Sequence, residues 1–273
     1  MADPVTDYYN RNPEGEWNRL FASPYRRVEF EVVHYFLTKY LPPAGKILDL
    51  GGGPGRYTIS LAKQGYRMAL VDLAPSVVEF ARKKIAAAGV QKQVDALIVG
   101  DGRDLRWWAD DAFDAVLCMG PLYHLPQPED RLRCLRECAR LAKPGAPLFV
   151  TVIPRCTFIR DALRSGGFED VAQQSLKALE EIFERGTSAK AEVPNMYFCR
   201  PEEIGEWLDA SGFELLELAS THGFAAFMDE KINVLGKNAE TWNVLMKMIL
   251  ATCADPASFA AAEHLIGVGR RKG

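Results

Sequence analysis

The chain has 273 residues, of which 48% are hydrophobic and 25% are charged, a balance that predicts one folded domain with elaborations and excludes a largely disordered chain. Its 33 Lys and Arg residues against 36 Asp and Glu residues give a formal net charge of −3. A chain with this charge carries no basic field, so nucleic acid and anionic lipid are not expected partners.

The cysteines and the N-terminus indicate a reduced, cytoplasmic protein. The six cysteines contain no Cys-x-x-Cys pair, and only Cys134 and Cys138 are separated by one helical turn. At that spacing buried neutral thiols are the usual outcome, so no metal site is expected. The first residues lack the basic and apolar regions of a secretion signal, and no apolar run approaches the roughly 18 residues that a membrane span needs.

Residues 1–44 are expected to form a helical N-terminal flap. Within them, residues 24–37 carry an amphipathic pattern, and the segment Leu41-Pro-Pro-Ala-Gly45 ends that helix.

After residue 44, short β-rich runs alternate with helical segments. The expected strands are residues 46–50, 66–71, 94–99, 113–119 and 147–153, and the expected helices lie near residues 55–64, 75–88 and 129–142. Strand–helix–strand alternation at this pitch gives right-handed crossovers and a parallel sheet with helices on both faces. The predicted fold class is therefore α/β, with a doubly wound, mostly parallel, seven-stranded Rossmann-like sheet.

The C-terminal part completes the sheet and adds helices. Residues 154–200 are more polar and helical and are interpreted as an inserted lid, whereas residues 45–153 and 201–273 form the core. A helix begins at Pro201, a strand covers residues 213–219, and a second helical block covers about residues 225–262. Residues 264–270 are expected to be a last strand that closes the edge of the sheet.

The clearest local motif is the segment Ile47-Leu-Asp-Leu-Gly-Gly-Gly-Pro-Gly-Arg56, an apolar strand that runs into a glycine-rich turn. Glycines let a ligand approach the backbone, and the first turn of such a sheet borders its ligand crevice. The spacing differs from Gly-x-Gly-x-x-Gly, and Asp49 would repel a pyrophosphate, so a dinucleotide is disfavoured. A structural turn that binds nothing is the alternative.

Acidic residues follow the next two strands. Asp72 ends the second strand, where a carboxylate can accept both hydroxyl groups of a ribose; the alternative is a helix cap. Asp101 follows the third strand and can accept a hydrogen bond from an exocyclic amine, although it could be an ordinary turn residue. The fourth strand ends at Met119, before a Gly-Pro break, at the same edge of the sheet.

Together these motifs resemble those of class I S-adenosylmethionine (SAM)-dependent methyltransferases of the small-molecule branch. The resemblance covers about residues 8–143 and rests on the glycine turn, Val71-Asp72, Gly100-Asp101-Gly102, the strand Phe113–Gly120 and Leu141-Ala-Lys-Pro-Gly-Ala146, where Ala146 replaces a usual glycine. It implies that SAM is the cofactor and S-adenosylhomocysteine (SAH) the product.

The resemblance also implies roles for individual residues. Asp72 would hold the ribose, Asp101 with Gly102 the adenine, and the Met119 backbone would face the methionyl ammonium group. Arg19, Arg26 or Arg56 could pair with the methionyl carboxylate. The residues expected to bind the cofactor are Tyr9, Arg19, Asp49, Gly51, Gly53, Gly55, Asp72, Leu73, Asp101, Gly102 and Met119.

Two residues after the fourth strand are the catalytic candidates. His124 could accept a proton near neutral pH, or it could simply cap or pack the next helix, and Tyr123 could orient the acceptor. His222 is a second candidate base, whereas His34 and His264 are interpreted as structural. Aromatic residues of the elaborations could roof an acceptor pocket, although most should be core residues: Tyr197, Phe198, Trp207, Phe224, Phe227 and Trp242.

The sequence therefore predicts metal-independent methyl transfer to an oxygen or nitrogen of a small, partly apolar metabolite. No Asn-Pro-Pro-Tyr segment follows the fourth strand, which disfavours base methylation. The remaining alternatives are a catalytically silent SAM-binding protein and, less favoured, a dinucleotide-dependent oxidoreductase. The expected partner is a small-molecule acceptor, with no nucleic acid and no membrane, and the protein is expected to be a monomer or a homodimer.

Overall fold

The computed structural model describes residues 3–164, 174–187 and 195–273. Its centre is a seven-stranded sheet in the order β3-β2-β1-β4-β5-β7-β6. The strands are β1 (Lys46–Leu50), β2 (Arg67–Asp72), β3 (Val94–Val99), β4 (Ala115–Met119), β5 (Pro147–Val152), β6 (Phe213–Ser220) and β7 (Leu265–Arg271). Strands β1 to β5 run parallel and β7 pairs antiparallel with β5 and β6, which confirms the Rossmann-like class.

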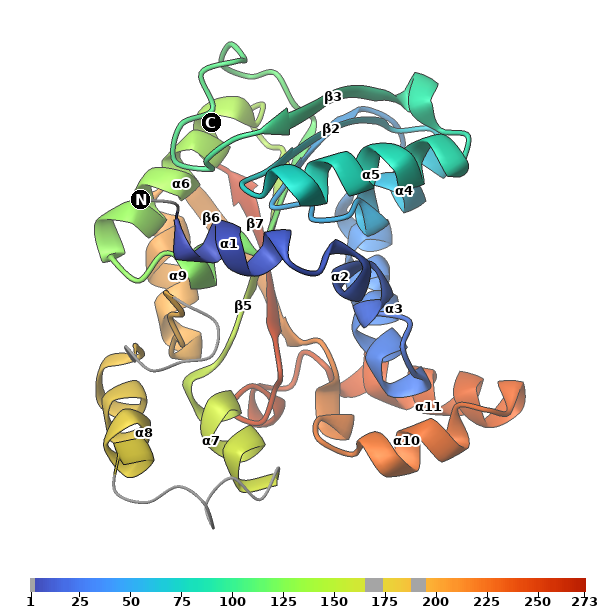
Figure 1. The fold of residues 1–273 in the computed structure, drawn as a ribbon, viewed down its shortest axis with the longest axis vertical. Helices are drawn as coiled ribbons and strands as arrows, with labels where there is room; N and C mark the ends of the chain where they lie inside the picture. Colours follow the sequence, from blue (N-terminus) through green and yellow to red (C-terminus); the bar gives the residue numbers. More distant parts are fainter. Residues whose placement is uncertain (1–2, 165–173, 188–194) are drawn as a thin grey trace.

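Helices cover both faces of the sheet (Figure 1). They are α1 (Pro4–Asn10), α2 (Pro13–Arg19), α3 (Pro24–Tyr40), α4 (Arg56–Lys63), α5 (Pro75–Ala87), α6 (Pro128–Leu141), α7 (Arg155–Arg164), α8 (Gln174–Arg185), α9 (Pro201–Ala210), α10 (Asp229–Leu235) and α11 (Ala239–Thr252). In the described ranges, none of these helices is long and apolar enough to cross a bilayer.

The N-terminal segment forms three helices, each with the same start signal. Asp3, Asn12 and Ser23 accept hydrogen bonds from backbone N–H groups of α1, α2 and α3, and a proline follows each of them. A capping side chain followed by proline satisfies the first turn, since proline has no N–H to leave unpaired. Both α1 and α2 contact α5, and Figure 1 shows them beside that helix.

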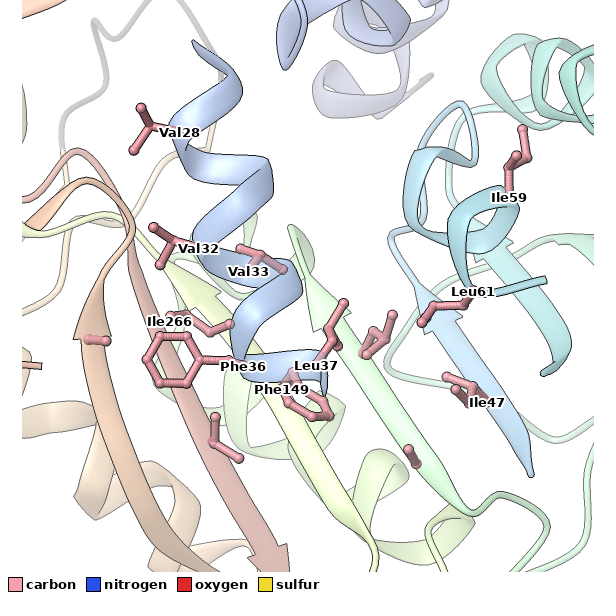
Figure 2. Close-up of a cluster of buried hydrophobic side chains, with 14 of the residues drawn as sticks. Val28, Val32, Val33, Phe36, Leu37, Ile47, Ile59, Leu61, Phe149 and Ile266 are labelled. Atoms are coloured by element: carbon pink, nitrogen blue, oxygen red, sulfur yellow. The ribbon is translucent and has the colours of Figure 1, made fainter. Parts of the chain in front are cut away.

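Successive side chains of each strand point to opposite faces of the sheet and pack into two separate apolar cores. Ile47, Leu117 and Phe149 face one side, where they pack with α3, α4 and α11. Leu48 and Val116 face the other side, under α6 and α9. Figure 2 shows the first core, to which α3 contributes Val28, Val32, Val33, Phe36 and Leu37 and the sheet contributes Ile47, Phe149 and Ile266.

The expectation that the last strand closes the edge of the sheet is wrong. β7 lies between β5 and β6, so β6 is the edge strand. Leu265, Ile266 and Val268 have no exposed surface, because both faces of β7 are covered. The absence of polar–apolar alternation in this strand is therefore the signature of an interior position. β4 also begins later than expected, at Ala115, because Phe113 forms only an isolated bridge with Ala142.

Candidate functional site

The glycine turn after β1 presents bare backbone to a cavity. Gly51 and Gly53 adopt positive φ angles of 70° and 55°. A Cβ atom on Gly51 would lie 2.6 Å from Pro121 Cδ, whereas a Cβ atom on Gly53 would have no neighbour within 4 Å. Gly51 therefore packs closely on Pro121, whereas Gly53 faces the open cavity. A ligand can approach the main chain of Gly53 because no side chain covers it.

Asp72 ties this turn to the end of β2. Its Oδ2 accepts a hydrogen bond from the Gly53 N–H at 2.9 Å, and its Oδ1 accepts one from the Ala74 N–H at 3.0 Å. Burial raises the pKa of Asp72, and these backbone donors oppose the rise. Each carboxylate oxygen of Asp72 keeps a second lone pair that could accept a hydrogen bond from a ligand hydroxyl group. The geometry is therefore compatible with both predicted roles of Asp72, as a ligand-binding residue and as a local cap.

Asp49 lies beneath the same turn and is 1% exposed. Its Oδ2 accepts a hydrogen bond from Thr58 Oγ1 at 2.5 Å. Burial raises the pKa of Asp49 to about 6, although the Thr58 hydroxyl and backbone oppose the shift.

The loop after β3 is held by an ion pair. Arg103 donates to both oxygens of Asp101, at 3.0 Å from Nε, and also donates to Asp130 at 2.8 Å. Although partial burial raises the pKa of Asp101, hydrogen bonds from Arg103 outweigh it and hold that pKa below its ordinary value. Gly102 packs directly on the core, since a Cβ atom there would lie 3.1 Å from Cys134 Sγ.

Of the eleven residues expected to bind the cofactor and the two catalytic candidates after the fourth strand, all but Gly55 line one cavity of about 330 Å³. They are Tyr9, Arg19, Asp49, Gly51, Gly53, Asp72, Leu73, Asp101, Gly102, Met119, Tyr123 and His124. Gly55 lies outside the lining: it precedes α4 with a positive φ of 85°, and a Cβ atom there would face Ala81 and Leu70. Its role is therefore to start the helix.

The cavity wall carries an excess of carboxylates. It includes the side chains of Asp3, Glu16, Asp49, Asp72, Asp101 and Asp130 against those of Arg19, Arg56 and Arg103. Such a wall repels a pyrophosphate and tolerates a positively charged ligand. The carboxylate acceptors of the wall and its excess of negative charge therefore fit a ribose-bearing cation such as SAM.

Tyr9 and His124 meet at the wall of the cavity. The Tyr9 hydroxyl lies 2.7 Å from His124 Nε2, and the Tyr123 ring packs edge-on against His124 with centroids 4.8 Å apart. Burial raises the pKa of Tyr9 above its ordinary value, so this hydroxyl stays protonated at neutral pH. The flap thus supplies a partner for the catalytic candidate 115 residues away.

Of the three candidate arginines, Arg19 and Arg56 reach the cavity. Arg19 Nη1 lies 3.4 Å from both oxygens of Glu29, which is 6% exposed. Burial alone would raise the pKa of Glu29, but Arg19 first and His264 second hold it well below its ordinary value. Arg56 donates to the Trp17 carbonyl oxygen at 2.7 Å. Arg26 instead pairs with Glu263 at 3.1 Å.

Several other candidates lie away from the cavity. His222 is fully buried against the Tyr25 ring, and burial lowers its pKa. None of the aromatic residues proposed as a roof is part of the lining among the described residues; Tyr197, for example, packs on Trp207 and Arg131. The aromatic residues of the wall are Tyr9, Tyr57 and Tyr123.

Sequence reasoning missed Tyr57 and Glu16. Tyr57 follows the glycine turn by two residues, and Glu16 precedes Arg19 by one helical turn, with 3.7 Å between Glu16 Oε2 and Arg19 Nε. The sequence could have indicated both residues, because Tyr57 lies next to the glycine turn and Glu16 lies one helical turn before Arg19.

Comparisons with known proteins agree with this geometry. Residues 47–145 match a family described as "Methyltransferase domain". A ubiquinone biosynthesis O-methyltransferase from Xanthomonas axonopodis pv. citri is 32% identical over 185 residues, which cover 67% of this chain and 69% of that protein. The protein of the same name from Xylella fastidiosa is 32% identical over 185 residues, covering 67% of each chain.

Solved structures share the fold. A SAM-dependent methyltransferase from Methanosarcina mazei superposes with a TM-score of 0.60 at 16% identity, covering 87% of this chain and 97% of that one. A 1,6-didemethyltoxoflavin-N1-methyltransferase from Burkholderia thailandensis, with bound SAH, gives a TM-score of 0.55 at 15% identity, covering 100% and 92%. The chain belongs to the class I SAM-dependent methyltransferases, and SAM is its cofactor.

Proposed function

We propose that this enzyme methylates an oxygen or nitrogen atom of a small, partly apolar metabolite, with His124 as the general base. The observation that carries the proposal is the 2.7 Å contact between the Tyr9 hydroxyl and His124 Nε2 in the wall of the cavity that holds the cofactor residues. A base placed there can take the proton that an oxygen or nitrogen acceptor loses.

The cofactor would be held by residues from four strand ends and from the flap. Asp72 would accept the ribose hydroxyl groups, and Gly53 would allow the ligand to approach its backbone. Asp101 would face the adenine amine with the lone pairs that Arg103 leaves. Arg19 would donate to the methionyl carboxylate while Glu29 holds its guanidinium group in place.

When bound, SAM supplies a methyl group on a sulfonium, which an acceptor atom displaces in line. The protein must then align the acceptor, exclude water and remove a proton. When the proton of neutral His124 is on Nδ1, the Tyr9 hydroxyl donates to Nε2 and occupies the single lone pair of that nitrogen. The acceptor's proton would pass to the Tyr9 oxygen while Tyr9 hands its own proton to His124 Nε2, so the proton ends on the imidazole, and Tyr123 would position the acceptor.

The nature of the acceptor is supported by the wall and by the relatives. Apolar side chains at the cavity include Val5, Leu20, Leu125 and Pro126, beside Tyr57. The curated relatives are named for O-methylation in ubiquinone biosynthesis, and one structural neighbour is named for N-methylation of a heterocycle. The apolar part of the wall and the names of the relatives support an oxygen or nitrogen acceptor on a partly apolar molecule.

The proposal includes roles for the elaborations. Tyr9 and Arg19 place the N-terminal flap in the cavity wall, and Asn195 contributes from the segment 154–200. Within the expected flap of residues 1–44, we therefore assign α1 and α2 as the part that covers the cofactor, whereas α3 packs on the sheet as part of the core. We assign residues 154–200, of which residues 165–173 and 188–194 lie outside the described residues, as a lid, around a core of residues 45–153 and 201–273.

The test combines an acceptor panel with variants of the catalytic pair. Purified enzyme with methyl-labelled SAM is assayed against phenols, catechols and heterocyclic amines. With an accepted substrate, His124→Ala should lower kcat by about 100-fold or more while the Kd for SAH changes less than about threefold. Tyr9→Phe should lower kcat by a smaller factor, and Tyr8→Phe on the same helix, outside the cavity lining, is the matched control.

Two outcomes oppose the proposal in different ways. Unchanged kcat in His124→Ala would remove His124 as the base. Tight SAH binding without label transfer to any acceptor of the panel would favour the catalytically silent SAM-binding alternative.

A further inference from the structure

Three cysteine thiols meet beneath the cofactor cavity. Cys118 comes from β4, and Cys134 and Cys138 come from successive turns of α6. The three Sγ atoms lie within 4.8 Å of one another, with 4.0 Å between Cys118 and Cys134, and none of the three side chains is exposed. Two of these thiols are neighbours by helical spacing, but the third is brought in only by the packing of α6 on the sheet.

The spacing suits one ion bound by three sulfur atoms. Bonds of about 2.3 Å from a central ion to three sulfurs at the base of a pyramid, with angles of about 100° between the bonds, separate those sulfurs by about 3.5 Å. The observed separations, of 4.0 Å for Cys118 and Cys134 and at most 4.8 Å in the group, therefore need to close by between about 0.5 and 1.3 Å. Within the described residues, the group contains no His, Asp or Glu as a fourth ligand. Zn²⁺ in structural sites takes four ligands, so a zinc site is disfavoured.

Charge selects among the ions that accept three thiolates. Three thiolates with a monovalent ion carry a net charge of −2, with a divalent ion −1, and with a trivalent ion zero. Burying an uncompensated charge in an apolar core is costly, and the cluster lies in the core that includes Leu50 and Leu135. The neutral complex is the one that this core favours.

We propose that Cys118, Cys134 and Cys138 form a binding site for one trivalent arsenic, taken up as arsenite. Three sulfur–arsenic bonds form and three arsenic–oxygen bonds break. The three thiol protons leave with the released oxygens as three water molecules, and no atom is oxidised or reduced.

The site is separated from the cofactor cavity only by the wall of that cavity. A Cβ atom on Gly102 would lie 3.1 Å from Cys134 Sγ, and Gly102 lines the cavity. Cys118 directly precedes Met119, which lines it as well. Drawing the three sulfurs together must therefore move the backbone against which the adenine and the methionyl group would lie. Arsenite and SAH should weaken each other's binding by the same factor, because the coupling of two sites is reciprocal.

The test titrates the full-length protein, reduced with a phosphine rather than a dithiol, with sodium arsenite. Native mass spectrometry should show one arsenic per chain, with three protons lost, and X-ray absorption should show three arsenic–sulfur bonds. The Kd for SAH should rise at least about fivefold in the arsenic-loaded protein. Cd²⁺ in a parallel titration should bind more weakly than arsenite.

Variants show whether the three thiols are the ligands. Cys134→Ala and Cys138→Ala should each weaken arsenite binding by more than the roughly 10- to 100-fold that loss of an outer-shell partner costs a metal site. Cys253→Ala is the matched control, since Cys253 is equally buried but outside the cluster, and it should bind arsenite as the wild type does.

Three results would overturn the proposal. They are no retained arsenic on the wild-type protein, two rather than three arsenic–sulfur bonds, and tighter binding of Cd²⁺ than of arsenite. None of the three needs a variant, so they decide the matter even if a cysteine substitution prevents folding. None of them depends on methyl transfer, so the result is separate from the proposed acceptor chemistry.

Discussion

Comparison of Gly53→Ala with Gly89→Ala tests whether Gly53 is needed for ligand approach as well as for the shape of the backbone. Gly53 has φ of 55°, lines the cavity, and has no atom within 4 Å of an added Cβ. Gly89, which follows α5, has φ of 71° and also no atom within 4 Å of an added Cβ. The two substitutions therefore impose the same backbone strain, and only one of them adds a methyl group to the cavity wall.

The expected costs follow from these geometries. A non-glycine residue in the left-handed region costs about 1–2 kcal/mol, and neither alanine meets a steric clash. At about 2–4 °C per kcal/mol for a domain of this size, both variants should unfold several degrees below the wild type. Gly53→Ala should in addition lose at least about 1.4 kcal/mol of SAH affinity, a tenfold rise in Kd, because the methyl group keeps the ligand from the backbone.

Calorimetric titration with SAH and thermal unfolding of the unliganded proteins provide the two measurements. Similar unfolding temperatures for the two variants with a Kd changed only in Gly53→Ala would support the reasoning. If Gly53→Ala bound SAH as tightly as Gly89→Ala does, the glycine turn would not be the surface on which the cofactor lies.

Three further variants probe the rest of the wall. Asp72→Ala should raise the Kd of both SAH and 5′-methylthioadenosine about 100-fold, because two hydroxyl bonds to a charged acceptor are lost; equal affinity would mean that the ribose lies elsewhere. Arg19→Ala should weaken SAH at least about tenfold but leave 5′-methylthioadenosine, which lacks the carboxylate, unchanged; parallel losses would refute that role. Asp49, with its pKa of about 6 in the folded state against an ordinary 3.8, makes the fold less stable as the pH rises between these values. Urea unfolding should therefore show Asp49→Asn gaining up to about 3 kcal/mol on the wild type between pH 4 and pH 8, and parallel pH profiles would contradict this.

Features that depend on neighbours in the sequence could be predicted. The glycine turn, Asp72 and Asp101 each follow a strand with a clear apolar pattern, and parallel strands bring their carboxyl ends to one edge. Knowing the order of the strands was not necessary for this, because every parallel strand ends at the same edge. The prediction that these residues lie together at one edge of the sheet was therefore insensitive to errors of a few residues in the expected bounds of the strands and helices.

Features that depend on burial or on distant contacts could not be predicted. β7 lacks alternation, and a sequence does not say whether such a strand is buried on both faces or is a weak edge strand. The sequence favours aromatic residues of the elaborations as a roof, but the aromatic residues of the cavity wall include Tyr57, which was not predicted, and Tyr123, which was. Composition shows that aromatic residues are available, and only packing shows which of them face the cavity.

The pairing of Tyr9 with His124 shows why the catalytic assignment needed a structure. From the sequence, His124 was equally well interpreted as a packing residue, since nothing near it in the chain polarises its ring. The structure adds a protonated hydroxyl from a helix 115 residues earlier, held there because α1 packs on α5 beside the glycine turn. If His124 is the base, the packing of α1 on α5 would both cover the cofactor and orient the base, so cofactor enclosure and base orientation would depend on one interface rather than on two.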